Sequence, residues 1–293
     1  MLTRKKSLKI QDRLGMRVGI AYGTYKKPNA KTTADVLEVL SDLYQAGFKA
    51  FVLCPELFER IEDSADIYKE HYSDLLKIRN LAAKYNIELA VRAESLPEDP
   101  VKLDTKLKIY FTVASIMDCR MFIMPPTFYT MMPKDQAVKL IVHKINETMN
   151  SLNLKVKIGI EATGKVKDVG SLEDILEISK RAGNSEPVLN FAHIHARGSG
   201  ALRSETDFKH VIDTVRKELG SAAIQNPYML FSGVKYCPSG EIQHIPFRKA
   251  DIDLNHLIKA IMTFGTKGTL IFEDPEREKG LLDMLKDFGE MVR

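Results

Sequence analysis

The sequence is poor in cysteine and has no long apolar run. Three cysteines in 293 residues, Cys54, Cys119 and Cys237, are odd in number and far apart. This pattern argues against a disulfide framework and against a cysteine-based zinc site, and it fits a reducing, cytoplasmic location. No stretch approaches the roughly 18 apolar residues that cross a bilayer, so we expect no contact with a membrane.

The sequence also lacks a large excess of either sign of charge. Lys and Arg number 43 against 39 Asp and Glu, a formal net charge of +4, which permits nucleic-acid binding but does not require it. The first 15 residues, MLTRKKSLKIQDRLG, are basic and lack the apolar segment of a secretory signal. We therefore expect a basic N-terminal arm over residues 1–15 and one folded domain over 16–293.

Short β-rich runs alternate with amphipathic helical patterns along the whole chain. The expected strands are Arg17–Ala21, Ala50–Leu53, Ile87–Val91, Met121–Met124, Val156–Ile160, Pro187–Phe191, Tyr228–Phe231 and Gly268–Phe272. The expected helices are Thr33–Gln45, Asp74–Tyr85, Leu103–Met117, Lys134–Leu152, Leu172–Ala182, Thr206–Leu219, Leu254–Phe264 and Gly280–Val292.

Eight strand–helix units without a linker predict a single (β/α)8 barrel of the α/β class. The alternative is a doubly wound open sheet, but no Gly-rich phosphate loop follows the first strand, which disfavours it. In a barrel of this kind the active site lies at the carboxyl ends of the strands. The residues that follow each apolar run are therefore the first candidates for function.

The segment VLNFAHIHARG, from Val188 to Gly198, carries His193 and His195 just past the sixth run. Glu161, His244 and Glu273 also lie just past strand-like runs. Histidine is the commonest metal ligand, so these positions indicate a site at the barrel rim. The competing interpretation is that the two histidines are ordinary polar residues of a strand-to-helix turn.

Four segments resemble the endonuclease IV group of the xylose isomerase-like barrels, and archaeal relatives of that enzyme most of all. They are IGIEATG (Ile158–Gly164), VLNFAHIHARG, FSGVKYCPSGEIQHIPF (Phe231–Phe247) and IFEDPE (Ile271–Glu276). The resemblance implies a DNA-repair hydrolase in which three zinc ions cleave the phosphodiester beside an abasic site. Such metals activate a water and neutralise charge on the phosphate.

Carried over residue by residue, the resemblance retains part of the metal site. Glu161 stands at the bridging glutamate, His193 and His244 at two histidine ligands, and Glu273 at the last glutamate. The departures are Asn190 for the strand-six aspartate, Arg92 for the strand-three histidine, Pro125 or its neighbour Met124 for the strand-four histidine, Leu230 for the strand-seven histidine, and Ile242 for a carboxylate, with Glu241 as the nearby substitute.

These departures limit the metal count. Arginine has no lone pair for a metal, and proline and leucine side chains cannot coordinate. His193, His244 and Glu241 are a two-histidine, one-carboxylate set compatible with one zinc ion. A second ion on Asn190 with Glu161 and Glu273 would lack a nitrogen ligand and bind weakly. We thus expect at most one divalent metal; the alternative is none, with these residues in a hydrogen-bond network.

Arg92 is the residue that most distinguishes this chain from the family pattern. Alternate barrel strands point their side chains into the same layer, so Arg92 on strand three and Glu161 on strand five are predicted to meet. The guanidinium would then replace a lost metal and form an anion pocket on that side. The alternative is that Arg92 swings out to solvent. Arg92, Glu161 and Glu273 form the candidate catalytic set.

Three functions are compatible with these residues. The first is a divergent, metal-assisted phosphodiesterase that acts on DNA at abasic sites. The second is a non-catalytic barrel that binds nucleic acid or a protein partner, and the third is an isomerase or epimerase acting on a sugar or sugar phosphate. For DNA, the candidate phosphate contacts in the loops after strands one and six are Lys26, Lys27, Lys31, Arg197 and Arg203.

Overall fold

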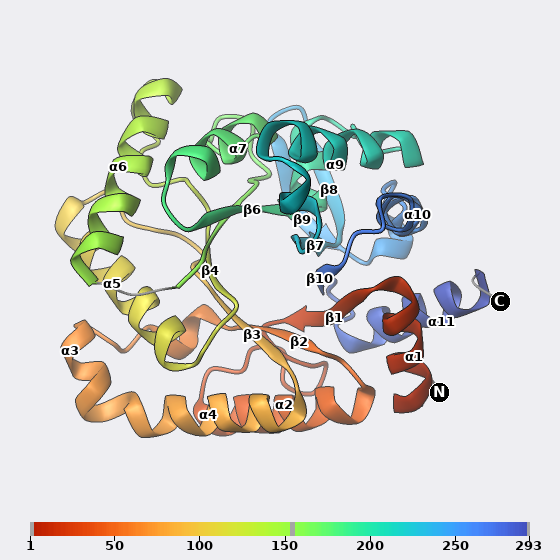
Figure 1. The fold of residues 1–293 in the computed structure, drawn as a ribbon, viewed down its shortest axis with the longest axis horizontal. Coiled ribbons are helices and arrows are strands. Elements are labelled where there is room, and N and C mark those ends of the chain that lie inside the picture. The colour runs from red at the N-terminus through yellow and green to blue at the C-terminus, as the bar shows by residue number, and fades with distance from the viewer. Residues whose placement is uncertain (1–2, 153–155, 292–293) are drawn as a thin grey trace.

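The computed structural model of the chain describes residues 3–152 and 156–291, and it forms a closed eight-stranded parallel barrel surrounded by helices (Figure 1). The barrel strands are β1 (Met16–Ala21), β2 (Ala50–Leu53), β3 (Glu88–Arg92), β4 (Met121–Met124), β5 (Ile158–Glu161), β6 (Ser185–Asn190), β7 (Tyr228–Phe231) and β10 (Gly268–Phe272). Neighbours in the chain are neighbours in the barrel, and β1 closes it against β10. The predicted (β/α)8 barrel is confirmed.

Helices connect the strands and cover the outside of the barrel (Figure 1). They are α1 (Arg4–Leu14), α2 (Thr33–Ala46), α3 (Ser64–Asp66), α4 (Tyr72–Tyr85), α5 (Pro100–Ile116), α6 (Lys134–Leu152), α7 (Leu172–Arg181), α8 (Phe191–Arg197), α9 (Glu205–Leu219), α10 (Leu254–Phe264) and α11 (Glu278–Met291). Shorter turns are η1 (Pro55–Phe58), η2 (Ile67–His71), η3 (Ser221–Ile224) and η4 (Phe247–Lys249), and a separate hairpin pairs β8 (Gly233–Cys237) with β9 (Gly240–Ile245).

Two apolar layers hold the barrel together. Side chains that point inward form a compact cluster that includes Val52, Ile123 and Leu230, all fully buried. Those that point outward join the apolar faces of the helices in a larger core. The small interior leaves no room for a side chain at Gly19, where a Cβ would lie 1.9 Å from the carbonyl oxygen of Ala50. The packed barrel therefore confines functional groups to its rim.

Helix starts follow the side-chain chemistry of the preceding residue. The Thr32 side chain accepts a hydrogen bond from the backbone N–H of Asp35 at the start of α2. Ser171 and Asp174 form a reciprocal capping box on α7. Such caps satisfy backbone donors that have no partner inside the helix. They also fix the ends of the loops that follow β1 and β5, at the rim where a site can form.

The expected elements agree with the structure, with shifts of one to three residues at several ends. Four strands and the helices Lys134–Leu152 and Leu254–Phe264 have the predicted bounds. The helix expected over Gly280–Val292 is α11, and Val292 lies outside the described residues. Among the elements that were not expected are helix α8, directly after β6, and the β8–β9 hairpin, in a segment for which neither a helix nor a strand was predicted.

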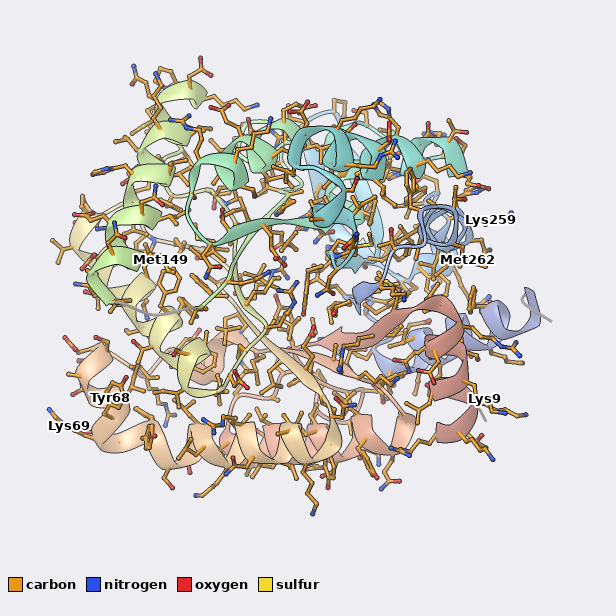
Figure 2. The ribbon with its side chains drawn as sticks, in the orientation of Figure 1. Lys9, Tyr68, Lys69, Met149, Lys259 and Met262 are labelled. Atoms are coloured by element: carbon orange, nitrogen blue, oxygen red, sulfur yellow. The ribbon has the colours of Figure 1, made fainter. Side chains whose placement is uncertain are left out.

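The expectation of an N-terminal arm outside the folded domain is wrong for the described part, residues 3–15. Residues Arg4–Leu14 form α1, which contacts β1, α2, α10 and α11. Its apolar face is buried at Ile10 and Leu14, while Lys9 points outward (Figure 2). Buried Gln11 accepts a hydrogen bond from Val18 and donates one to the carbonyl of Gly47. The folded domain therefore begins before Met16.

No helix in the described part of the chain is both long enough and apolar enough to cross a membrane.

The buried face of α1 makes a stability prediction. We expect Leu14→Ala to lower the free energy of unfolding by about 2–5 kcal/mol, because it removes a buried side chain and leaves a cavity. The control Lys5→Ala, on the exposed face of α1, should change it by less than about 0.5 kcal/mol. Urea unfolding followed by circular dichroism measures both. Equal, small effects would show that α1 does not stabilise the barrel.

Candidate functional site

Arg92 lies between two carboxylates at the carboxyl-end rim. It is the last residue of β3, Glu161 is the last of β5, and Glu273 directly follows β10. The Nε and Nη2 atoms of Arg92 donate to the two oxygens of Glu161 at 2.7 and 2.5 Å, and Nη1 pairs with Oε1 of Glu273. The side chains are 12%, 1% and 4% exposed, respectively. The predicted Arg92–Glu161 pair is confirmed, and Arg92 does not swing out to solvent.

Two further residues complete this cluster. Arg92 Nη1 also donates to the hydroxyl of Tyr22, 2.6 Å away. Tyr22 directly follows β1 in a left-handed conformation with φ 69°, which is uncommon for a residue with a side chain. Asn190, fully buried at the end of β6, donates through Nδ2 to Glu161 at 2.9 Å and to Glu273 at 3.0 Å. Every acceptor in the cluster thus faces a donor.

The expectation of an anion pocket at Arg92 is not met. Its guanidinium is shared by two carboxylates, so the cluster carries a net negative charge and does not attract a phosphate. Burial would lower the pKa of Arg92, but the charges of Glu161 and Glu273 raise it well above its ordinary value. Burial would likewise raise the pKa of Glu273, and the charges of Arg92 and the nearby histidines hold it below its usual range. Arg92 and Glu273 therefore keep their charges at neutral pH.

Asn190 is not placed as a metal ligand. Its Oδ1 accepts the backbone N–H of His193 at 3.2 Å and so caps helix α8. Its Nδ2 has no lone pair to give. The weak second ion expected on Asn190, Glu161 and Glu273 is therefore not supported, because Arg92 lies where that ion would bind.

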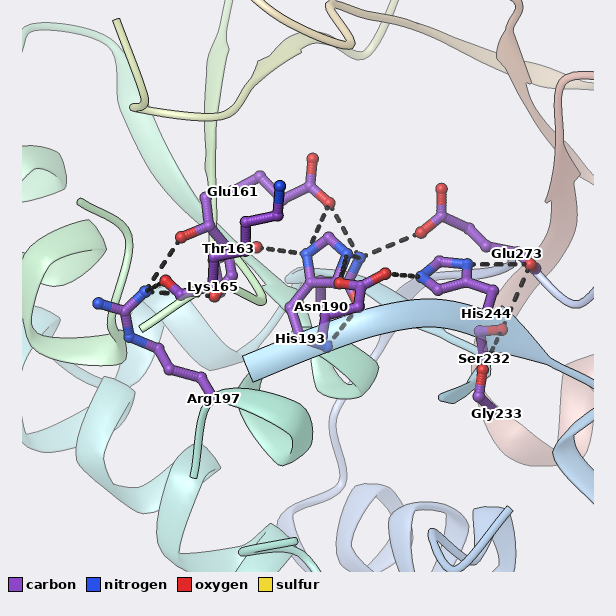
Figure 3. Close-up of polar contacts among 12 residues, drawn as sticks. Glu161, Thr163, Lys165, Asn190, His193, Arg197, Ser232, Gly233, His244 and Glu273 are labelled. Carbon is purple, nitrogen blue, oxygen red and sulfur yellow. Dashed lines mark hydrogen bonds and ion pairs between the residues drawn. The ribbon is translucent and has the colours of Figure 1, made fainter. Parts of the chain in front are cut away.

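His193, Glu241 and His244 meet beside this cluster (Figure 3 labels the two histidines). His193 comes from α8, and Glu241 and His244 come from β9. The Nε2 atom of His193 is 3.1 Å from one Glu241 oxygen, and Nε2 of His244 is 3.2 Å from the other. One ligand atom from each residue lies within 4.8 Å of the others. The structure thus brings together the three residues predicted to hold one metal.

The hydrogen bonds of the two rings suit metal binding. Nδ1 of His193 lies 2.7 Å from the carbonyl oxygen of Ala162, and Nδ1 of His244 lies 3.4 Å from that of Glu273. A carbonyl can only accept, so Nδ1 carries the proton and Nε2 presents a lone pair in each neutral ring. Nε2 of His244 is buried and has no hydrogen-bond partner of good geometry among the described residues. This unsatisfied atom fits a metal ligand.

The carboxylate of this set is ionised. Burial raises the pKa of Glu241, but the close approach of the His244 ring and the charges of His193, His244 and Arg92 lower it to about 2. For His244, burial lowers the pKa, and the nearby carboxylates of Glu241 and Glu273 raise it above the ordinary value. An anionic carboxylate between two imidazoles can bind a divalent cation once both rings present a free Nε2 lone pair.

His195, the second histidine of the motif, serves the scaffold. It is fully buried, its Nδ1 accepts from the backbone of Leu202 at 3.1 Å, and its Nε2 donates to Asp251 at 3.0 Å. Tyr236 on β8 donates to the other oxygen of Asp251 at 2.6 Å and meets the His195 ring edge-on. The hydrogen bonds among His195, Asp251 and Tyr236 connect α8 to the hairpin. They therefore fix the position of His193, on α8, relative to Glu241 and His244, on β9.

Most of the residues expected to contact phosphate are engaged within the protein. Arg197 donates to the backbone carbonyls of residues 163, 165, 166 and 168 and to the Thr163 hydroxyl. Figure 3 labels Arg197 with two of these partners, Thr163 and Lys165. Arg203 donates to the carbonyl of Gly200 and pairs with Asp251 at 3.5 Å. In the loop after β1, Lys27 pairs with Asp35 and Glu38 and Lys31 with Glu56, while Lys26 is exposed.

Three features of the site were not assigned from the sequence. Tyr22 directly follows a predicted strand, so it lay among the first candidate positions, but no role was given to it. The alternating runs around Pro238, Ser239 and Gly240 are typical of a hairpin. Nothing local signals Asp251, because its partner His195 lies 56 residues away.

Comparisons with known proteins place the fold in a family. The profile of the xylose isomerase-like TIM barrel family matches residues 40–288. An uncharacterized protein of Methanocaldococcus jannaschii is 26% identical over 234 residues, which cover 78% of this chain and 83% of that protein.

Solved structures agree in fold. SacUVDE superposes with a TM-score of 0.69 at 14% identity, and endonuclease IV from Thermus thermophilus with 0.65 at 14%. D-psicose 3-epimerase from Clostridium cellulolyticum superposes with 0.63 at 13%. Each match covers 94% of this chain and 99% of the other. At such low identity these likenesses show the fold alone, and the family is shown by the profile match over most of the chain: the protein belongs to the xylose isomerase-like TIM barrel family.

Proposed function

We propose that this protein is a single-metal phosphodiesterase of the endonuclease IV type, which binds DNA and cleaves it at abasic sites. The observation that carries the proposal is the convergence of His193, Glu241 and His244, with both Nε2 atoms facing the carboxylate. A bound divalent ion, zinc by this ligand set, would supply positive charge to a phosphodiester and activate water.

The charges of the protein favour such an ion. Glu161, Glu273 and Glu241 carry three negative charges, and Arg92 offsets one of them. A phosphodiester would be repelled from this rim until a divalent cation is present. Cation binding and DNA binding at the site are therefore coupled, and the ligand residues act in binding as well as in cleavage.

The two alternatives are weaker. A sugar isomerase or epimerase would use Glu161 and Glu273 as its paired carboxylates, and both are bound by Arg92. A non-catalytic barrel that binds nucleic acid or a partner is supported by the same observation, since Arg92 fills space that further metals would need. The presence of a complete ligand set for one metal favours the phosphodiesterase over the non-catalytic barrel.

Metal content is the first test. Protein purified without chelator should contain one zinc ion per chain or less, and the double variant His193→Ala, His244→Ala should contain none, because two of three ligands are gone. His210→Ala, on the exposed side of α9, is the matched control and should match the parent. Elemental analysis measures all three. Two or three stoichiometric ions in the parent, or an ion retained by the double variant, would contradict the ligand assignment.

Activity is the second test. We expect incision of abasic duplex DNA at well below about 1 per second, the low end of ordinary enzyme turnover. Each missing charge-stabilising group typically costs on the order of a hundredfold in rate. The double histidine variant should lose the activity, whereas His210→Ala should keep it. Cleavage that persists in the double variant or in Glu161→Gln is contamination, and a metal-loaded parent that cuts nothing supports the non-catalytic candidate.

Arg92 generates a third prediction. Arg92→His should take up a second divalent ion in isothermal titration calorimetry, because it replaces a cation with a ligand between Glu161 and Glu273. Arg92→Lys keeps the charge and should bind the same number of ions as the parent. Without added metal, Arg92→Ala should lose about 3–5 kcal/mol of unfolding free energy, since it leaves two buried carboxylates unpaired. A parent-like stability of Arg92→Ala would show that the ion pairs do not hold the rim.

A further inference from the structure

Glu241 and His244 lie three residues apart on β9, and yet their side chains meet on one side of the hairpin, with Nε2 of His244 3.2 Å from a Glu241 oxygen. In a regular strand successive side chains alternate, so residues three apart point to opposite faces. The β8–β9 register explains the exception. Lys235 pairs with Gln243 and Tyr236 with Glu241, so Ile242 has no partner across the hairpin. This one-residue bulge leaves Ile242 53% exposed and turns Glu241 toward the side of His244.

A second segment supports Glu241 from the other side. The loop after β5 runs alongside the start of β9, with an isolated bridge between Lys165 and Gly240. The backbone N–H of Glu241 donates to the carbonyl of Gly164 at 2.9 Å, and that of Val166 donates to Ser239 at 3.1 Å. Arg197 holds the loop in this shape through its contacts with the backbone carbonyls. The backbone at Glu241 is thus held between this loop and the hairpin.

Gly164 is the point of closest approach. A Cβ atom there would lie 2.2 Å from Oε2 of Glu241 and 2.6 Å from its Cβ. Oε2 is the oxygen that faces Nε2 of His193. Gly164 is not among the residues with positive φ, so its backbone conformation is open to alanine. The need for glycine is therefore steric, and what a side chain would displace is Glu241.

We propose that Gly164 and the bulge at Ile242 are positioning elements that set the Glu241 carboxylate as the third metal ligand. This inference rests on the proposed metal site. Because Gly164 has no side chain, the Glu241 carboxylate can occupy the space beside it. The bulge turns the Glu241 side chain toward the two histidines. The ligand set is consequently a product of three separate segments, α8, β9 and the loop after β5.

The test is Zn²⁺ titration of chelator-treated protein by isothermal titration calorimetry. Gly164→Ala should weaken Zn²⁺ binding by roughly 10–100-fold, the usual effect of losing a group that orients a ligand. Gly183→Ala is the matched control: its Cβ would meet one side-chain atom at 3.5 Å, Oδ1 of Asn146, so its affinity should equal that of the parent. Circular dichroism and thermal unfolding without metal should be alike for all three proteins.

A double-mutant cycle separates positioning from general damage to the loop. In a Glu241→Ala background, Gly164→Ala should cause no further loss of Zn²⁺ affinity, because no carboxylate remains to be displaced. Equal losses in both backgrounds, or parent-like affinity of Gly164→Ala, would overturn the inference and leave the metal site standing. A parent protein that binds no Zn²⁺ would overturn the proposed function with it.

Deletion of Ile242 tests the bulge by itself. The deletion places Glu241 two residues before the histidine, where a regular ladder keeps both side chains on one face. Zn²⁺ affinity within about tenfold of the parent is expected, as the ligand atoms keep their side. A loss as large as that of Glu241→Ala would show that the bulge does not serve to aim the carboxylate.

Discussion

The buried ion pairs of Arg92 are the interaction on which this rim depends. Glu161 and Glu273 end or follow strands on opposite sides of β3, and both are almost fully buried. Without a cation between them, two buried like charges would repel and would lose the solvation that water gives them. The guanidinium neutralises one charge and orients both carboxylates. It does so permanently, since its neighbours raise its pKa further.

The ion pairs of Arg92 divide the rim into two chemically different halves. In one half, on β1, β3, β5, β6 and β10, a fixed organic cation occupies the centre, and Tyr22 and Asn190 complete its hydrogen bonds. In the other half, two imidazoles and a carboxylate face one another. The first half is built on barrel strands that the core holds rigidly. The second is carried by elements added to the barrel, α8 and the β8–β9 hairpin.

The added elements explain where several polar residues are used. Four polar residues hold α8, the hairpin and the loop after β5 together: Arg197, Arg203, His195 and Asp251. Arginine is suited to this because its planar donors can satisfy several backbone carbonyls at once. The basic residues next to the ligand set therefore organise the set itself.

The barrel and part of the site follow from the sequence alone. Alternating β-rich and amphipathic runs determine eight parallel strands, and the closure of the barrel then brings residues such as Glu161 and Glu273 to one rim. The meeting of Arg92 with Glu161 is predictable because both end odd-numbered strands, whose side chains share a layer. Helix α1 was missed because its burial depends on partners such as Gly47 and α11, which are far away in sequence.

Only the tertiary structure determines the net charge of the site and the orientation of its side chains. Whether Arg92 would bind an anion or be satisfied internally depended on the distance of Glu273, 181 residues away. Asn190 has the atoms of a ligand, but its oxygen caps α8 and its nitrogen faces two carboxylates. Glu241 reaches the histidines only through a bulge and a glycine on another loop. Side-chain type and spacing determine which groups reach the rim, whereas long-range contacts determine the direction and charge with which they act there.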